Sequence, residues 1–386
     1  KPSIEAALKC GKSILLLGPR QVGKTTLLKE LPLDASISLA RPSLRQAYER
    51  DIERFSQEIE ALAEGCNKIP LVAVDEVQKI PELMDAVQDL IDRDIAQFIL
   101  TGSSARKLRA KHALNWLPGR VVLFHLDPLS ISELPQAYLN LDNLLFYGSL
   151  PDIVLENNNE HREQDLESYV VTYLEEEVRQ EALVRKLGDF ARFLSLAAAE
   201  SGQTVNFNRI SQDIGVAQTT ITAYYQILED CLIAERIEPF LKNSTTRRRV
   251  IKACKYLFFD LGVRRIAAAE GIQPSEKIMG QWFEQFIGLV LLRHARITSH
   301  KTTLHFWRDL EGREVDWVIN MPDKIIPIEV KWTDKPTLKD ARHLKTFLQD
   351  YEQEKGYVVC RCSKARKLDE HITAIPWQDM LTEIMK

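Results

Sequence analysis

The sequence predicts an α/β protein whose first part is built around a parallel β-sheet. Four short apolar runs near the amino end alternate with stretches of helical periodicity, a pattern typical of buried parallel strands joined by helices. The strand signal then fades into a helical middle region, and strands return in the last third of the chain. The four apolar runs are Ile14–Leu17, Leu71–Val74, Phe98–Leu100 and Val121–Leu126.

The chain length and these changes of pattern predict three regions. At roughly 100–200 residues per domain, a chain of 386 residues has room for two or three domains. We expect an α/β domain over residues 1–135, a helical region over 136–245 and a small α/β domain over 246–386.

The composition excludes several classes of protein. The chain has 51 basic and 55 acidic residues, so it is not basic as a whole, and any binding to nucleic acid needs a local patch. The six cysteines are scattered without a CxxC pair, which argues against a disulfide framework or a zinc site. No apolar run reaches ~18 residues, so we expect no membrane helix and a cytoplasmic protein.

A nucleotide-binding loop follows the first apolar run. The segment GPRQVGKT matches the pattern GxxxxGK[ST] between a predicted strand and a predicted helix. Its glycines let backbone N–H groups close around phosphates. Lys24 is expected to reach the β- and γ-phosphates, and the Thr25 hydroxyl to bind Mg²⁺. The predicted ATP and Mg²⁺ site consists of Gly18, Pro19, Arg20, Gln21, Val22, Gly23, Lys24, Thr25 and Thr26.

The second apolar run ends in two carboxylates. Its four apolar residues bring Asp75 to the carboxyl end of a strand, where it can hold Mg²⁺ through the hydration shell. Glu76 is then placed to polarise the attacking water. An apolar strand that ends in Asp-Glu is by itself weak evidence for a nucleotide site. Because this strand follows the GPRQVGKT loop in the chain, the evidence becomes strong.

Two further positions have alternative interpretations. Ser103 or Ser104, after the third apolar run, either senses phosphate and orients water or caps a helix. Arg120, before the fourth run, either reaches a γ-phosphate or is a plain surface arginine. In the first case it acts in its own chain or in a neighbouring subunit.

Together these motifs resemble a bacterial and archaeal family of AAA-type ATPases with a C-terminal domain of unknown function. The resemblance rests on GPRQVGKTT, AVDEVQ, LTGSS, PGR before a strand, and the YGSLP segment at 147–151. It covers nearly the whole chain. It implies a P-loop NTPase core of AAA type, a winged-helix segment and a restriction-endonuclease-like end. The family's P-loop, acidic pair and arginine fall on Gly18–Thr25, Asp75–Glu76 and Arg120.

The middle region is typical of a helix-turn-helix. We expect helices at Ile210–Ile214 and Gln218–Leu228 with Gly215 in the turn, and a basic segment follows at 242–252. In one interpretation this segment binds DNA, and in the other it is an internal lid or protein-contact module. The DNA-reading candidates are Gln218, Thr219, Thr220 and Thr222, with Arg247, Arg248 and Arg249 on phosphates.

The last region predicts an αβββαβ order with D…ExK on adjacent strands, which resembles the PD-(D/E)XK nuclease core. Asp316 and Glu329 lie on neighbouring strands and can hold a divalent metal, and Glu284 on the preceding helix completes the metal shell. Lys331 points to the same face as Glu329 because strand side chains alternate. It can lower the pKa of a metal-bound water. The alternative is a nuclease-like scaffold kept for interaction.

Two functions therefore compete. The first is an ATP-hydrolysing switch whose nucleotide state controls the C-terminal module as a metal-dependent DNA nuclease, favoured by Asp316, Glu329 and Lys331. The second is an ATP-dependent regulator or scaffold that binds DNA or protein without cleavage. The net charge of −4 and the acidic run Glu175–Glu177 favour it. A homo-oligomer or a protein partner is compatible with both. No pore-loop signal supports a third function, a remodelling motor.

Overall fold

The computed structural model describes residues 1–104, 119–174, 187–241, 253–298 and 301–384. They form two compact units, Lys1–Pro128 with Ile227–Ile233 and Leu129–Gln226 with Ala234–Lys386. The acidic run Glu175–Glu177 and the basic segment 242–252 lie outside the described residues. Among the described residues, no helix combines the length and apolar character needed to cross a membrane.

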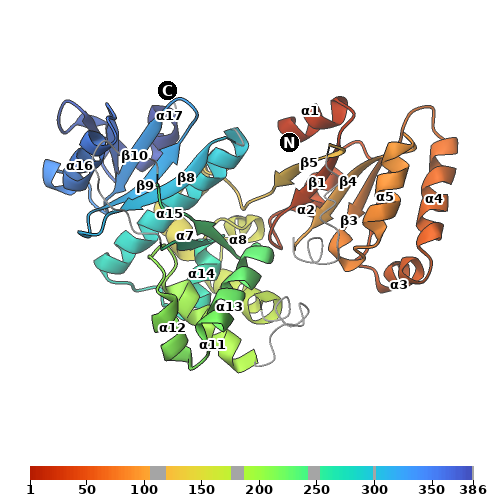
Figure 1. Cartoon of the computed structure of the whole chain (residues 1–386), viewed down its shortest axis with the longest axis horizontal. Coiled ribbons are helices and arrows are strands. Elements are labelled where there is room, and N and C mark those ends of the chain that lie inside the picture. The colour runs from red at the N-terminus through yellow and green to blue at the C-terminus, as the bar shows by residue number, and fades with distance from the viewer. Residues whose placement is uncertain (105–118, 175–186, 242–252, 299–300, 385–386) are drawn as a thin grey trace. The chain divides into compact units, whose positions relative to one another are not determined.

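The sheet of the first unit confirms the predicted parallel α/β architecture. Within the described part of this unit, five strands pair in the order β2-β3-β4-β1-β5, and every pairing is parallel (Figure 1). The edge strand β2 (Ala35–Ser38) was not predicted, because it is short, partly exposed and has a single large apolar residue. The other strands match the four apolar runs: β1 (Ser13–Leu17), β3 (Leu71–Asp75), β4 (Gln97–Gly102) and β5 (Val121–His125).

Both faces of this sheet are covered by helices. Alternate side chains of one strand enter opposite cores: Leu15 packs with α3, α4 and α5, whereas Ile14 packs with α1 and α2. This double burial explains why the strands read as continuous apolar runs. The helices are α1 (Pro2–Lys9), α2 (Lys24–Lys29), α3 (Pro42–Arg50), α4 (Ile52–Glu64) and α5 (Leu83–Asp92), with the 3-10 turn η1 (Val77–Lys79) after β3.

The predicted helix-turn-helix belongs to the second unit, except that its second helix ends within the segment Ile227–Ile233 of the first unit. Helices α12 (Phe207–Ile214) and α13 (Gln218–Asp230) flank Gly215, whose φ of 80° is the left-handed conformation that glycine adopts readily. Strand β6 (Ala234–Ile237) follows and pairs antiparallel with β7 (Lys255–Phe258), a pairing that spans residue 245 where the second predicted region ends. The preceding elements are η2 (Gln136–Tyr138), α7 (Leu141–Tyr147), α8 (Pro151–Leu155), α9 (Asn159–Ser168), η3 (Tyr169–Leu174) and α11 (Leu187–Ala199), and α14 (Leu261–Ala267) follows β7.

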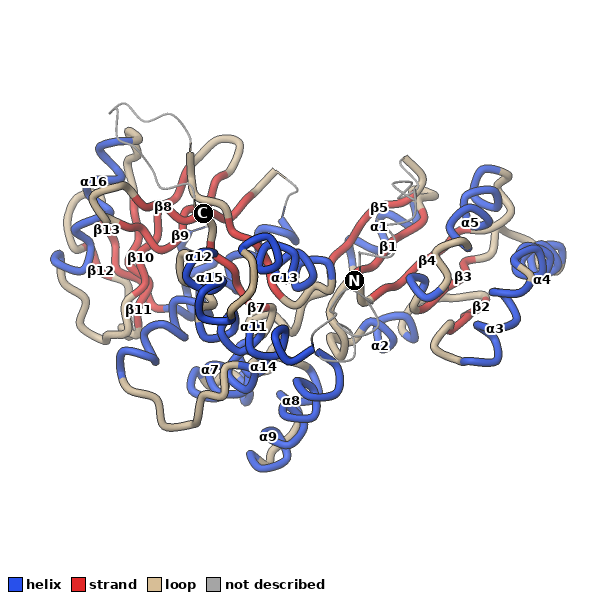
Figure 2. The backbone as a smooth tube through the Cα atoms, turned by 60° about the horizontal axis from the view of Figure 1, so that its bottom comes forward, coloured by secondary structure: helices blue, strands red, loops and turns tan. Residues whose placement is uncertain are grey.

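The C-terminal part of this unit is a mixed sheet, and the predicted αβββαβ order is confirmed. In the described residues six strands lie in the order β12-β13-β11-β10-β9-β8 (Figure 2). The predicted elements are α15 (Glu276–Thr298), β8 (Thr303–Arg308), β9 (Glu314–Asn320), β10 (Ile325–Val330), η4 (Leu338–Ala341) with α16 (Arg342–Asp350), and β11 (Gly356–Cys360). Beyond the prediction are β12 (Arg366–Lys367), β13 (Ile372–Pro376), η5 (Trp377–Asp379) and α17 (Met380–Ile384).

Helices α15 and α16 cover opposite faces of this sheet. Ile326 and Ile328 of β10 pack with α15, whereas Ile325 packs with α16. The helix α15 comes close to the sheet at Gly288, where a Cβ would collide with the ring of Trp317. This close approach sets the position of Glu284 one turn earlier on the same helix.

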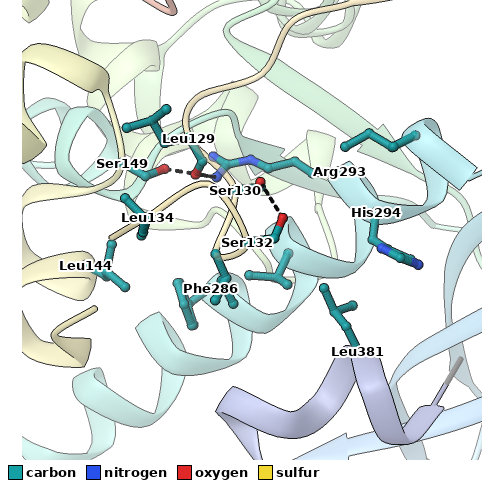
Figure 3. Close-up of a pocket in the computed structure, with 13 residues that line it drawn as sticks. Leu129, Ser130, Ser132, Leu134, Leu144, Ser149, Phe286, Arg293, His294 and Leu381 are labelled. Carbon is teal, nitrogen blue, oxygen red and sulfur yellow. Dashed lines mark hydrogen bonds between the residues drawn. The ribbon is translucent and has the colours of Figure 1, made fainter. Parts of the chain in front are cut away.

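The YGSLP segment at 147–151 connects distant parts of the second unit through buried hydrogen bonds, and we call it the structural joint. Gly148 has a φ of 75°, and a Cβ there would collide with the buried carboxylate of Asp260. The Ser149 N–H donates to Asp260 Oδ2 at 2.7 Å, and Ser149 Oγ accepts from Arg293 at 2.9 Å (Figure 3). The cavity beside Arg293 measures about 30 Å³, room for about one water molecule.

Candidate nucleotide site and carboxylate cluster

The parallel sheet of the first unit brings the predicted nucleotide residues to one edge. Strands β3, β4 and β1 are neighbours and run in the same direction, so their carboxyl ends lie side by side. The loop that begins at Gly18, the Asp75–Glu76 pair and Ser103 each follow or end one of these strands. The sheet therefore gathers three motifs that are far apart in the sequence.

The loop after β1 is tightly built. A Cβ on Gly18 would collide with the carbonyl oxygen of Leu126, and Gln21 and Gly23 both have a positive φ. Lys24 is buried, and its Nζ donates to the carbonyls of Gly18 at 2.8 Å and Pro19 at 2.7 Å. The Lys24 ammonium is thus held against the backbone carbonyls of the same loop.

The donor set at this edge fits a magnesium-bound triphosphate. The Thr25 and Thr26 side chains are exposed on the first turn of α2, and Asp75 at the end of β3 is half-buried. Hydroxyl and carboxylate oxygens are ligands that Mg²⁺ accepts, and a lysine ammonium suits phosphate oxygens. Side chains of the required types therefore lie at the carboxyl ends of neighbouring strands.

Two polar residues that sequence reasoning missed connect the predicted ones. Thr101 at the end of β4 donates its hydroxyl to Asp75. Gln78 donates from Nε2 to Glu76 Oε2 at 2.7 Å and to Ser103 Oγ at 2.9 Å. Glu76 itself has a φ of 62°, a conformation uncommon for a non-glycine residue. The available signal for Gln78 was its place two residues after Glu76, because η1 turns the chain back toward that carboxylate.

Arg120 lies away from this edge, which corrects the interpretation that it reaches a phosphate in its own chain. Val121 pairs with Ser13 at the start of β1, so Arg120 lies at the amino end of the strands, opposite the loop. Its Nη2 donates to Asp92 Oδ2 at 2.8 Å. The parallel direction of β5 causes this placement, since the residue before a strand and the loop after its parallel neighbour fall at opposite edges.

A second site forms in the C-terminal sheet, where the predicted nuclease-like residues meet. Lys331 Nζ lies 2.6 Å from Glu329 Oε1 and 3.8 Å from Asp316 Oδ2. Asp316 Oδ2 also accepts from the N–H of Val330 at 2.7 Å, which joins β9 to β10. Glu284 from α15 lies within the same group, because its carboxylate, that of Glu314 and that of Asp316 have oxygens within 4.8 Å of one another.

Lys255 from β7 enters this group, and sequence reasoning missed both Lys255 and Glu314. Lys255 Nζ lies 2.7 Å from Glu314 Oε1 and 3.2 Å from Glu284 Oε1. Its side chain is 2 % exposed. No local pattern revealed it, because a lysine at the start of a strand reads as a surface residue. We call the six residues Lys255, Glu284, Glu314, Asp316, Glu329 and Lys331 the carboxylate cluster.

Charge in the carboxylate cluster is partly balanced internally. Burial lowers the pKa of Lys255, but the carboxylates of Glu284, Glu314 and Asp316 outweigh burial and raise it, so Lys255 stays an ammonium. Burial raises the pKa of Glu284 to about 7, against the opposing effect of Lys255. Burial and then Asp316 raise the pKa of Glu329. The two lysines thus compensate part of the negative charge that the four acidic side chains bring to the cluster.

Lys255 opposes the binding of a divalent metal at Glu284 and Glu314, because the ammonium and the metal would share the same carboxylate oxygens. A dication bound through the two oxygens that Lys255 contacts would lie within about 5 Å of its ammonium, given metal–oxygen distances of about 2.1 Å. Repulsion between such charges amounts to about 7 kcal/mol at an effective dielectric constant of about 20. Lys255 thus occupies the cation position beside Glu284 and Glu314, while Lys331 pairs with Asp316 and Glu329.

A basic cavity of about 710 Å³ opens beside Glu329 and Lys331. Lys339 and Arg342 at its wall are exposed, whereas Lys345 pairs with Asp369 at 2.8 Å. Positive side chains outnumber carboxylates in the lining, so this surface suits an anionic ligand. The lining residues are Glu329, Lys331, Leu338, Lys339, Asp340, Arg342, His343 and Lys345.

Comparison with known families identifies the class of the first domain. The model of an AAA domain matches residues 11–135. Models of two domains of unknown function, DUF8612 and DUF4143, match residues 138–276 and 279–380. The chain therefore has an AAA ATPase domain followed by two domains of unknown function, and an AAA domain implies ATPase activity with binding of ATP and Mg²⁺.

The similar proteins are bacterial and archaeal, as the resemblance implied. Uncharacterized protein Rv2008c of Mycobacterium tuberculosis is 26% identical over 98% of this chain and 83% of its own. Uncharacterized protein MJ1637 of Methanocaldococcus jannaschii is 24% identical over 95% and 84%. A solved RuvB mutant of Thermotoga maritima aligns with 60% of this chain and 85% of its own at 17% identity, with a TM-score of 0.28.

Proposed function

We propose that this protein is an ATP-hydrolysing switch whose nucleotide state controls its C-terminal module, and that this module binds DNA without cutting it. One observation carries the first part: the parallel sheet gathers Lys24, Asp75, Glu76 and Ser103 at one edge. The module is a winged-helix segment, from α12 to β7, followed by a restriction-endonuclease-like sheet.

Each residue at the nucleotide edge has a role that follows from its chemistry. Lys24, held by the loop carbonyls, presents a fixed positive charge to the β- and γ-phosphates. Thr25 and Asp75 hold Mg²⁺, which supplies charge neutralisation of the phosphate oxygens when bound. Glu76 polarises the attacking water, and Gln78 keeps the Glu76 carboxylate oriented toward Ser103.

DNA binding is supported by two exposed surfaces of the second unit. Gln218, Thr219 and Thr222 are exposed on α13, whereas Tyr225 of the same helix is buried and its ring stacks on that of Tyr256 in β7, with ring centres 4.2 Å apart. The second surface is the basic cavity beside Lys331. The proposed absence of cleavage is supported by Lys255, whose ammonium pairs with Glu284 and Glu314.

The proposed switch is tested by measuring ATP turnover and nucleotide affinity in the variant Lys24→Ala. This change removes the fixed charge on the phosphates, so both turnover and affinity are expected to fall. Lys29→Ala, an exposed lysine at the far end of the same helix, is the matched control and is expected to behave like the wild type. Unchanged turnover in Lys24→Ala would refute the assignment of the loop.

A metal-dependent nuclease is the second candidate, favoured by the meeting of Asp316, Glu329 and Lys331. It predicts cleavage of DNA with Mn²⁺ or Mg²⁺ that Asp316→Ala, Glu329→Ala and Lys331→Ala each abolish, while ATP turnover persists. Assays with ATP, with ADP and without nucleotide decide between the candidates. Cleavage by the wild type in any of these states overturns the non-cleaving assignment.

A further inference from the structure

We propose that Lys255 is the resident cation of the carboxylate cluster and that a divalent metal ion binds there only when Lys255 is withdrawn. Glu284, Glu314 and Asp316 converge from a helix and a strand, with oxygens within 4.8 Å of one another. Such an arrangement requires positive charge between the carboxylates. Lys255 supplies it, at 2.7 Å from Glu314 and 3.2 Å from Glu284.

Aromatic rings hold Lys255 in this position. Its Nζ lies 5.0 Å from the centre of the Phe306 ring and 5.2 Å from that of Trp317, both within the range of a cation–π contact. Trp317 also donates from Nε1 to the Glu284 carbonyl at 3.0 Å, so one ring contacts the lysine and braces the helix that carries a carboxylate. The ammonium is therefore held between two rings and two carboxylates, away from solvent.

The cluster also keeps acceptor capacity for a metal ion. Glu329 is 6 % exposed, and its Oε2 has no hydrogen-bond partner among the described atoms. A buried oxygen without a donor is costly, and it is available to a further cation. The carboxylates would thus receive a dication once the ammonium left.

The position of Lys255 couples the cluster to the segment before it. Lys255 pairs with Ile237 in the β6–β7 hairpin, which follows the helix-turn-helix, whereas the carboxylates belong to α15, β9 and β10. A displacement of this hairpin would withdraw the cation from the cluster. The consequence is that metal binding in the C-terminal sheet depends on the hairpin.

The experiment measures Mn²⁺ binding to the full chain without nucleotide, through the paramagnetic resonance signal of free Mn²⁺. Lys255→Met keeps the aliphatic stem and removes the charge. We expect it to bind one Mn²⁺ per chain at least about tenfold more tightly than the wild type, because the repulsion is gone. Lys255→Arg keeps the charge and should match the wild type. Adding Glu314→Gln to Lys255→Met should abolish the gain.

If Lys255→Met folds poorly, the effect of Mn²⁺ on its thermal unfolding midpoint tests the proposal in place of the binding measurement. That variant leaves carboxylates without their cation, so Mn²⁺ should raise its unfolding midpoint and leave the wild-type midpoint unchanged. The double variant Lys255→Met/Glu314→Gln removes one charge of each sign and should unfold closer to the wild type than Lys255→Met does.

Two results would overturn the proposal. The first is a wild-type protein that binds Mn²⁺ as tightly as Lys255→Met and loses the ion in Glu314→Gln, since lysine and metal would then coexist. The second result has two parts: Mn²⁺ does not raise the unfolding midpoint of Lys255→Met, and adding Glu314→Gln does not restore the stability of that variant. Neither result depends on ATP hydrolysis, so both are independent of the proposed switch.

Discussion

The side-chain amide of Gln78 joins the Glu76 carboxylate to the Ser103 hydroxyl, with hydrogen bonds of 2.7 and 2.9 Å. Gln78 is buried, and its own Oε1 has no partner among the described atoms. Because both N–H donors of this amide bind site residues, Gln78 fixes the orientation of the Glu76 carboxylate.

This relationship predicts that Gln78 is a positioning residue for ATP hydrolysis. Glu76→Gln should keep nucleotide affinity and lower turnover by about 10²–10⁴-fold, since an amide cannot polarise water as a carboxylate does. Gln78→Met, similar in length but without donors, should also keep affinity and lower turnover by a smaller factor. Equal losses of affinity and turnover in Gln78→Met would mean that the residue supports the fold of the loop instead.

Arg120 is predicted to act on the nucleotide of a neighbouring subunit, since it lies at the edge opposite its own loop. Arg120→Ala should bind ATP normally and turn it over slowly. Mixing it with Lys24→Ala protein should restore part of the activity, because each partner supplies what the other lacks. Asp92→Asn, which removes the present partner of Arg120, is the control and should stay active. No recovery at any mixing ratio would contradict action between subunits.

The basic cavity predicts local, salt-sensitive DNA binding. Lys339→Gln and Arg342→Gln remove exposed positive charges from its wall. Each lost phosphate contact should reduce the slope of log K against log salt by about 0.9 on duplex DNA. Lys364→Gln, an exposed lysine outside this lining, is the matched control. An unchanged slope in both cavity variants would remove this surface from the DNA interface.

The raised pKa of Glu284, about 7, predicts a pH dependence of stability. The folded protein keeps a proton on Glu284 that the unfolded chain releases above about pH 4.5, near the ordinary pKa of glutamate. Stability from this group is therefore full at low pH and declines as pH rises toward 7. Glu284→Gln should flatten this part of the stability curve, measured by urea unfolding from pH 4.5 to 8. Identical curves would show that folding does not raise the pKa of Glu284.

Gly148 predicts a test of the structural joint. Gly148→Ala places a Cβ against Asp260 and forces a backbone conformation that costs about 1–3 kcal/mol for other residues. Gly215→Ala, at a left-handed glycine with a ψ of 35° and open space around it, is the control for a positive φ alone, whereas Gly148 has a ψ of −154°. The free energy of unfolding should fall further in Gly148→Ala. Equal losses would contradict the added cost expected at Gly148.

The sequence by itself determined the nucleotide edge and the order of elements in the C-terminal sheet. The reason is local: Lys24, Asp75 and Ser103 follow strands that the apolar runs identify, and parallel strands bring their carboxyl ends together. A different rule placed Asp316 and Glu329 on neighbouring strands, because two strands joined by a short turn pair antiparallel, as β9 and β10 do. Each of these positions follows from a short segment and one rule of connection.

The tertiary structure alone decided where Arg120 and Lys255 lie. The position of Arg120 depends on the strand with which β5 pairs and on the direction of that pairing. Because β5 runs parallel to β1, Arg120 lies at the edge of the sheet opposite the nucleotide loop. Lys255 reaches the carboxylates because β7 packs beside α15 and β9, although nothing in its own segment distinguishes it from a surface lysine. Burial converts that lysine into a counter-ion, and burial is a property of contacts between distant segments.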